Sequence, residues 1–262
     1  MEISNKTSRE KPRNLWKKVD YKKYHSHVTI SSIDTIIKSE EIDDKIIYMD
    51  EIEKRKEVYG ICGECNEPGT GGRWCQPCNA KRFEENFKNW TSGNKEIDEL
   101  TQHSQLNAVH YTKCLEWIPF EKFQNVTYIT RGGFGKIYSA VWPEGYIGYW
   151  DIENQRWKRS MNIMVALKSL DNSSEINQIS SPDLYLGYCL LLWNNSRSKI
   201  LNTKDFMMVL DYCKDGNLRN YYLNNSCNMK LHHLSEIANG LLNIHNAEKV
   251  HKDFHSEITN ES

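Results

Sequence analysis

The sequence predicts an α+β protein, in which an antiparallel sheet is followed by helices and preceded by a small cysteine-rich segment. Three observations support this fold class. Strand-like stretches flank a glycine-rich turn at residues 132–135, an apolar stripe at helical spacing runs over residues 231–245, and four cysteines are paired within residues 62–78. An apolar content of 39% and an aromatic content of 11% are enough for a packed core, so the chain as a whole is not disordered.

The composition excludes several classes of function. The formal net charge is −1, with 34 Lys and Arg against 35 Asp and Glu, which argues against a nucleic-acid partner attracted by bulk charge. The N-terminus lacks the apolar core of a secretion signal. The longest apolar run, residues 184–193, is far shorter than the roughly 18 residues that a membrane helix needs. We therefore expect an intracellular, cytoplasmic protein with no membrane partner.

Changes in composition divide the chain into four predicted regions. These are a polar N-terminal region, a cysteine-rich segment, a helical linker and a C-terminal domain, at residues 1–56, 57–82, 83–123 and 124–262. The first is rich in Lys and Glu without strong apolar periodicity, so we expect it to be flexible or loosely packed. In the linker, the spacing of Phe83, Phe87 and Trp90 indicates a helix, and Ser92 is the expected cap of a second one.

The cysteines of the second region have the spacing of metal ligands. They form two Cys-x-x-Cys pairs separated by nine residues, namely Cys62, Cys65, Cys75 and Cys78. Two such pairs can place four thiolates around one Zn²⁺, and the glycines at positions 63–72 would allow the tight turns required. Because four protein ligands leave no open position, the predicted zinc is structural and the segment is zinc-ribbon-like. The alternatives are four unrelated thiols or one redox pair, but redox pairs usually stand alone beside a βαβ pattern.

The C-terminal domain begins with strands around a glycine-rich turn. Residues 126–129 and 136–142 are strand-like, which indicates a hairpin, and its glycine-rich turn can offer backbone N–H groups to phosphates. A polar insertion with tryptophans, residues 145–159, precedes the strand 163–167. Lys168 follows that strand and is the expected partner of the α- and β-phosphates of a nucleotide. Each pattern alone is common in ordinary hairpins and strands, and only their joint order is informative.

Two later segments complete the pattern. Residues 207–212 read as a buried strand that ends in a hinge, where main-chain groups of Asp211 and Cys213 are the expected partners of adenine. The helix at 231–245 packs one apolar face and leads to His251-Lys252-Asp253. There, Asp253 is the candidate base that orients a substrate hydroxyl, whereas the histidine has a structural role.

From about Gln124 the sequence resembles a tyrosine-kinase-like protein kinase domain. It resembles particularly the expanded kinase families of arbuscular mycorrhizal fungi, which often carry a CxxC…CxxC segment before that domain. The resemblance implies a protein-kinase-like N-lobe with an antiparallel sheet, a partial helical C-lobe, ATP with Mg²⁺, and a protein substrate phosphorylated on Ser, Thr or Tyr. The implied catalytic residue is Asp253. The implied ATP-binding residues are Ile129, Gly132, Gly133, Phe134, Gly135, Ile137, Ala166, Lys168, Asp211 and Cys213.

The chain also departs from the family pattern. Thr130 occupies the first glycine position of the loop. Residues 179–193 contain a proline and a non-periodic apolar run where a helix with a glutamate for Lys168 is expected, so this segment reads like a mis-spliced insert. Ile258 stands where an Mg²⁺-binding asparagine is expected, and the chain is truncated after the catalytic loop without an Asp-Phe-Gly. We therefore expect weak ATP binding, a defective Mg²⁺ site and no phosphotransfer.

Three functions are compatible with these patterns. The first is a protein kinase family member in signalling that binds ATP and belongs to a phosphotransferase family. The second is a non-catalytic adaptor, in which a pseudokinase lobe and a zinc ribbon mediate protein–protein interaction with an unknown partner. The third is a fragment without a stable C-lobe. Nucleotide turnover, a specific protein partner and aggregation, respectively, would distinguish them.

Overall fold

The computed structural model describes residues 13–30, 44–132, 135–169, 190–193 and 206–212, together with 214, 234, 237, 238 and 241. The predictions for Gly133, Phe134, Cys213 and Asp253 lie outside the described residues. The chain divides into two compact units that alternate along the sequence. The first unit comprises Met1–Asn89, Gln102–Cys114 and Ile147–Arg159, and the second comprises Trp90–Thr101, Leu115–Tyr146 and Ser160–Ser262.

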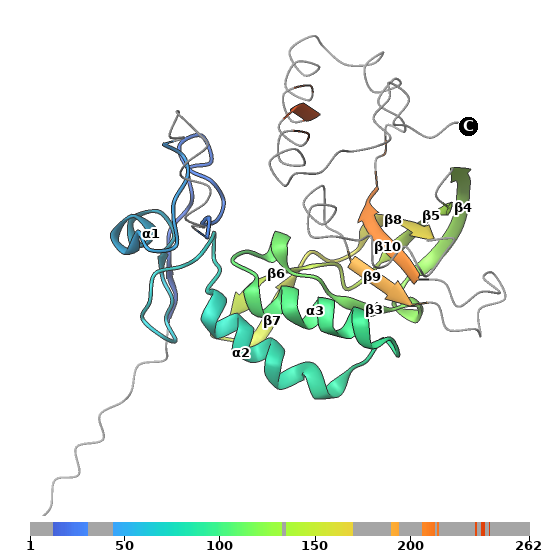
Figure 1. The fold of residues 1–262 in the computed structure, drawn as a ribbon, viewed down its shortest axis with the longest axis horizontal. Helices are drawn as coiled ribbons and strands as arrows, with labels where there is room; N and C mark the ends of the chain where they lie inside the picture. The colour runs from blue at the N-terminus through green and yellow to red at the C-terminus, as the bar shows by residue number, and fades with distance from the viewer. Residues whose placement is uncertain are drawn as a thin grey trace, which may run out of the picture. The chain divides into compact units, whose positions relative to one another are not determined.

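The second unit is built on a six-stranded sheet with the strand order β3-β9-β10-β8-β5-β4 (Figure 1). Its strands are β3 (Trp117–Pro119), β4 (Gln124–Gly132), β5 (Gly135–Trp142), β8 (Ile163–Ser169), β9 (Leu190–Trp193) and β10 (Phe206–Asp211). All neighbouring strands pair antiparallel except β3 and β9, which are parallel. The predicted antiparallel sheet, with its hairpin and two later strands, is confirmed.

Strand β9 lies within the segment that reads, in the sequence, like a mis-spliced insert. It pairs on both sides, with Leu192 opposite Met207 of β10 and opposite Ile118 of β3. Residues 190–193 therefore belong to the sheet, and the interpretation of the surrounding run as a mis-spliced insert stays a prediction.

The core of the second unit lies under one face of this sheet. Alternate residues of β5, β8 and β10 are buried, as a sheet with one covered face requires. The buried set is Ile118, Phe123, Tyr138, Ala140, Trp142, Val165, Leu167, Met207 and Val209. The opposite face of β5 and β8 is only partly covered, and it carries the residues that the sequence assigned to a nucleotide.

The first unit surrounds the cysteine-rich segment. Its elements are β1 (Leu15–Trp16), α1 (Ile52–Val58), β2 (Gly60–Ile61), α2 (Gln76–Asn86) and the two-stranded sheet of β6 (Ile147–Asp151) and β7 (Arg156–Arg159). Helix α3 (Lys95–Asn107) begins in the second unit and ends in the first. Single 3-10 turns lie at η2 (Phe87–Asn89), η3 (Tyr111–Lys113) and η4 (Phe120–Lys122). None of the helices in the described parts of the chain has the length and apolar character needed to span a bilayer.

The N-terminal region differs from the flexible segment that its composition predicted. In the described residues 13–30 and 44–56, Val19, Val28 and Ile47 are buried in one cluster with Tyr59. These residues lie in turns and isolated β-bridges rather than in helices or long strands. One backbone hydrogen bond there runs from Thr29 N to the carbonyl of Ile47. Apolar residues in irregular backbone have no period, so a search for periodicity misses them.

The helix predicted from the spacing of Phe83, Phe87 and Trp90 differs in the structure, because α2 begins at Gln76 and ends at Asn86, and Phe87 lies in the 3-10 turn η2. Helix α3 confirms the second helix predicted in the linker, but its expected cap is wrong. Asn94 Oδ1 accepts hydrogen bonds from the backbone N–H groups of Glu96 (2.9 Å) and Ile97 (3.3 Å), at the start of α3. Ser92 instead donates its hydroxyl to the carbonyl of Asn94 (3.0 Å). Asparagine and serine are equally good caps, so local sequence could not choose between them.

Candidate functional site

Strands β5 and β8 bring predicted nucleotide-binding residues to one face of the sheet. Ile137 is opposite Lys168, and Ser139 is opposite Ala166. Directly opposite residues of an antiparallel pair project from the same side. Ala166 and Lys168 alternate with the buried core residues of β8, such as Leu167, and are themselves half-buried. An apolar wall and a lysine therefore share the face away from the core.

The glycine-rich hairpin closes at one end of this face. Gly132 and Gly135 are the last paired residues of β4 and β5. The pairing shifts between Tyr128 and Thr130, so Ile129 is the extra residue of a β-bulge. Bulges bend a strand and change the direction of side chains, and they often lie beside functional sites.

Gly135 is required by its backbone, and Ser169 holds the strand that leaves the turn. Gly135 has φ of +129°, and a Cβ atom there would lie 2.0 Å from the carbonyl oxygen of Ser169. The buried Ser169 Oγ accepts a hydrogen bond from Lys136 N (2.9 Å), one position beyond the last β5–β8 pair at Ile137 and Lys168. Sequence reasoning missed this serine, whose only signal is its position directly after Lys168.

Strand β10 delivers the predicted hinge to the other side of β8. Leu210 is opposite Ala166, and Asp211 is opposite Val165. The strand ends at Asp211, where the sequence predicted a hinge. Ala166 therefore lies beside the last residues of β10, next to the predicted hinge.

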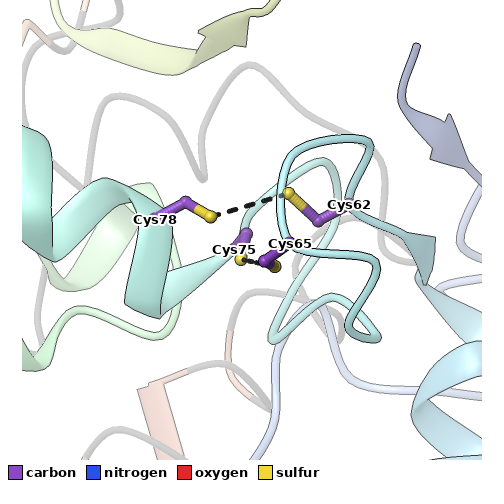
Figure 2. A group of neighbouring side chains, drawn as sticks. All are labelled: Cys62, Cys65, Cys75 and Cys78. Atoms are coloured by element: carbon purple, nitrogen blue, oxygen red, sulfur yellow. Dashed lines mark hydrogen bonds between the residues drawn. The ribbon is translucent and has the colours of Figure 1, made fainter. Parts of the chain in front are cut away.

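The four predicted metal ligands converge in the first unit (Figure 2). All four Sγ atoms lie within 4.8 Å of one another, with 3.9 Å between Cys62 and Cys78 and 3.6 Å between Cys65 and Cys75. Zinc–sulfur bonds of about 2.3 Å in a tetrahedron imply sulfur–sulfur distances of about 3.8 Å, whereas a disulfide bond measures about 2.05 Å. The geometry and the donor set thus fit one Zn²⁺.

The thiols of this cluster cannot all ionise without a cation. A hydrogen bond with Cys75 lowers the pKa of Cys62 to about 5. The same interaction, together with burial, raises the pKa of Cys75 far above its ordinary value, and burial raises that of Cys78 to about 12. One thiolate therefore forms at the expense of its neighbours. A divalent cation removes this conflict because it binds the deprotonated form of every ligand.

Local backbone fixes the first cysteine pair. Cys62 N donates to the carbonyl of Glu67, and Asn66 N donates to the carbonyl of Cys62, both at 2.9 Å. Asn66 adopts a left-handed conformation with φ of +61°. The glycines that were expected to allow the tight turns, Gly63, Gly69, Gly71 and Gly72, do not have a positive φ. Gly63 is instead required for close approach, because a Cβ atom there would lie 2.2 Å from the carbonyl oxygen of Arg13.

The second pair is placed by helix α2 and by the residue before it. Cys75 caps α2, and Cys78 lies in its first turn. Trp74 is fully buried and donates its indole N–H to the carbonyl of Ala108 (2.6 Å). Thr70 donates its hydroxyl to the carbonyl of Val109 (3.0 Å). The chain between the two pairs is therefore bonded to the segment after α3.

A buried arginine supports the loop between the pairs, and no sequence signal marked it. Arg55 of α1 is 5% exposed and donates hydrogen bonds to the carbonyls of Met49 (2.6 Å), Pro68 (2.8 Å) and Gly69 (3.1 Å). Bonds from a charged donor to buried carbonyls are among the stronger ones. In sequence, this residue is one of several charged positions in α1, and only the tertiary structure distinguishes it.

The sheet and its glycine-closed hairpin are those of an α+β, protein-kinase-like lobe. A family model described as protein tyrosine and serine/threonine kinase matches residues 123–257. The match covers more than half of the 262 residues, and the chain belongs to this family. A comparison with curated proteins gives no match. The predicted kinase domain is thus confirmed, whereas the finer resemblance to fungal kinase families stays a prediction.

Proposed function

We propose that the chain binds ATP on the open face of β5 and β8. The observation that carries this proposal is the shared face of Ile137, Ala166 and Lys168, with the glycine-closed hairpin at one end and the last residues of β10 beside it. Lys168 supplies a positive charge for the α- and β-phosphates, and backbone N–H groups of the glycine turn complete their binding. Ile137 and Ala166 provide the apolar surface for adenine.

We further propose that this polypeptide does not transfer phosphate. The family uses ATP with Mg²⁺, but Ile258 stands where an asparagine ligand is expected after Asp253. Mg²⁺ requires oxygen ligands, which an aliphatic side chain cannot provide. Phosphoryl transfer depends on positioning and on neutralisation by the metal. Binding without turnover is therefore the expected behaviour, with an affinity that depends little on Mg²⁺.

Calorimetric titration with ATP tests the binding site. Lys168→Met should weaken binding about tenfold or more, equivalent to at least ~1.4 kcal/mol, because a phosphate contact is lost. Lys136→Met, on the neighbouring strand, is the matched control and should bind as the native chain does. Equal affinities for all three proteins would contradict the proposed site. A radiolabelled ATP assay tests activity, and turnover that disappears in Asp253→Asn would show that the chain is an active kinase.

We propose one structural Zn²⁺ per chain, held by Cys62, Cys65, Cys75 and Cys78. The convergence of four thiols from two loops supports this proposal, as does the small size of the apolar clusters around them. Binding energy for the metal would then act as folding energy for the unit. Elemental analysis of protein purified without chelator should find about one zinc per chain. A metal-free preparation with native structure around Trp74 would refute the site.

A non-catalytic adaptor is the second candidate function. It is favoured by the location of residues 147–159, which lie inside the matched kinase region but belong to the first unit. Cysteine-rich and kinase sequence thus build one unit together, which could present a joint surface to a protein. A purified partner that binds the native chain without nucleotide turnover, and fails to bind when the β6–β7 hairpin is replaced by a short linker, would support this role.

A further inference from the structure

The connection between β5 and β8 is a hairpin that packs in the first unit. Its strands β6 and β7 pair with Trp150 opposite Trp157 and Asp151 opposite Arg156. The turn is fixed by Asn154, whose backbone N–H (3.1 Å) and side-chain amide (2.8 Å) both donate to the carboxylate of Asp151. The sequence marked this segment only as a polar insertion with tryptophans, and its two strands form a sheet separate from that of β5 and β8.

Trp157 stacks against the elements that carry the second cysteine pair. Its ring centroid lies 5.8 Å from that of Trp74 and 5.1 Å from that of Phe83, with interplanar angles of 26° and 16°. Trp74 directly precedes Cys75, and Phe83 lies on α2, the helix that carries Cys78. Trp74 and Phe83 are both buried, and Ile147 of β6 belongs to the same apolar cluster.

The hairpin also reaches the first cysteine pair through one arginine. The Arg82 guanidinium lies 4.3 Å from the ring centroid of Trp150. The same guanidinium forms an ion pair with Glu64, which stands between Cys62 and Cys65. A second arginine, Arg73, lies over the ring of Tyr149 at 5.1 Å. Side chains of this hairpin therefore contact Trp74 and Phe83 beside the second cysteine pair, and Arg82, which pairs with Glu64 in the first.

We propose that the β6–β7 hairpin is a part of the metal centre, with Trp157 as its positioning residue. This inference rests on the proposed zinc binding and extends it to residues inside the kinase domain. Trp157 stacks on Trp74 and Phe83, and it acts by holding Trp74 and α2 where Cys75 and Cys78 meet the other pair. Residues that orient metal ligands from behind commonly change metal affinity by 10–100-fold when altered. Linkage is reciprocal, so the metal also stabilises the packing of the hairpin.

The zinc affinity of full-length variants tests whether the hairpin supports metal binding. The native chain, Trp157→Ala, Trp157→Phe and Arg156→Ala would compete for Zn²⁺ with a chromogenic chelator at one pH. Trp157→Ala should bind zinc about tenfold or more weakly. Trp157→Phe keeps a ring in the stack and should stay close to the native affinity. Arg156→Ala, an exposed position on the same hairpin, is the control for a general effect of substitution.

Hydrogen exchange on the unmodified chain tests whether the metal stabilises the hairpin. This experiment needs no substituted protein, so it does not require that a variant folds. Removal of zinc should speed exchange across residues 147–159 while the β5–β8–β10 ladder keeps its protection. Native zinc binding, with no loss of affinity in Trp157→Ala and no change of exchange in the hairpin, would overturn the linkage alone. A native chain that binds no zinc would overturn the metal site and this inference together.

Discussion

The two units of this protein are stabilised in different ways. The second has one apolar core under a six-stranded sheet, in which strand pairs satisfy the backbone. The first has two smaller apolar clusters, and buried polar side chains such as Arg55, Thr70 and Trp74 bond its irregular backbone. Stability is thus spread over many similar contacts in one unit and concentrated in a few directional groups, with the proposed metal, in the other. Local damage should have different consequences in each.

Removal of the metal should have the largest effect, and it should be confined to the first unit. Chelation, or Cys75→Ser, should unfold that unit, because structural zinc contributes on the order of 10 kcal/mol to small domains. Hydrogen exchange should then be fast in α1, α2 and the β6–β7 hairpin but slow in β5 and β8. Met164→Ala, at a 40% exposed position of β8 in the second unit, is the control and should keep the zinc. Simultaneous loss of protection in both units would abolish the contrast between them.

A cavity in the sheet core should have the converse effect. Leu167 is fully buried, so Leu167→Ala should lower the free energy of unfolding of the second unit by about 2–5 kcal/mol. Zinc content should not change, because no metal support lies in that core. Met164→Ala on the same strand, at a position 40% exposed, should cost far less. Denaturant unfolding followed with zinc analysis gives both quantities, and zinc loss in Leu167→Ala would contradict the expected independence.

Acid should weaken the first unit through a buried histidine. Burial lowers the pKa of His110 to about 3, from an ordinary value of 6.5. The folded state therefore keeps this ring neutral while the unfolded chain binds a proton, so stability present above pH 6.5 is lost as the pH falls toward 3. At pH 5 the loss amounts to about 2 kcal/mol.

A comparison of the native protein with His110→Asn isolates the contribution of His110 to the pH dependence of stability. Protonation of the cysteines affects both proteins equally and therefore cancels. Unfolding of the first unit, measured from pH 7 to pH 5 at constant zinc, should have a steeper pH dependence in the native chain. His27, whose ring centroid lies 5.6 Å from that of His110, has its pKa lowered by burial and contributes in the same direction. Parallel pH profiles for the two proteins would show that His110 is not the cause.

The smallest expected effect concerns the start of α3. Asn94→Ala removes the acceptor for two backbone N–H groups and should cost about 1 kcal/mol. Asn94→Asp keeps the acceptor and adds a charge that the helix N-terminus favours, so it should be at least neutral. The first turn of α3 is assigned to the second unit and the last to the first, so exchange along this helix also shows whether fraying stays local. Uniform exchange along α3 in Asn94→Ala would argue against a local cap.

Sequence reasoning succeeded where one local pattern determines one structure. The strand-like stretches around the glycine turn form β4 and β5, and the Cys-x-x-Cys spacing brings four thiols together. It failed where the partner is distant in sequence. Arg55 is indistinguishable from its charged neighbours until Pro68 and Gly69 fold over it, and β9 pairs with β3, which is distant in sequence, as well as with β10. The role of Trp157 depends on Trp74 and Phe83, which no local window contains.

The interleaved path of the chain has a consequence for its synthesis. The first unit needs residues up to Arg159, so it cannot be completed while the ribosome has made only the cysteine-rich segment. By then β4 and β5 have already emerged, whereas β8, which lies between β5 and β10 in the sheet, has not. A nascent chain paused just before Arg156 would contain two incomplete units at once. A chain paused after Arg159 would contain a complete first unit and one incomplete unit, the second. Zinc uptake measured on stalled chains of increasing length should therefore rise sharply across β7, well after all four cysteines have left the ribosome.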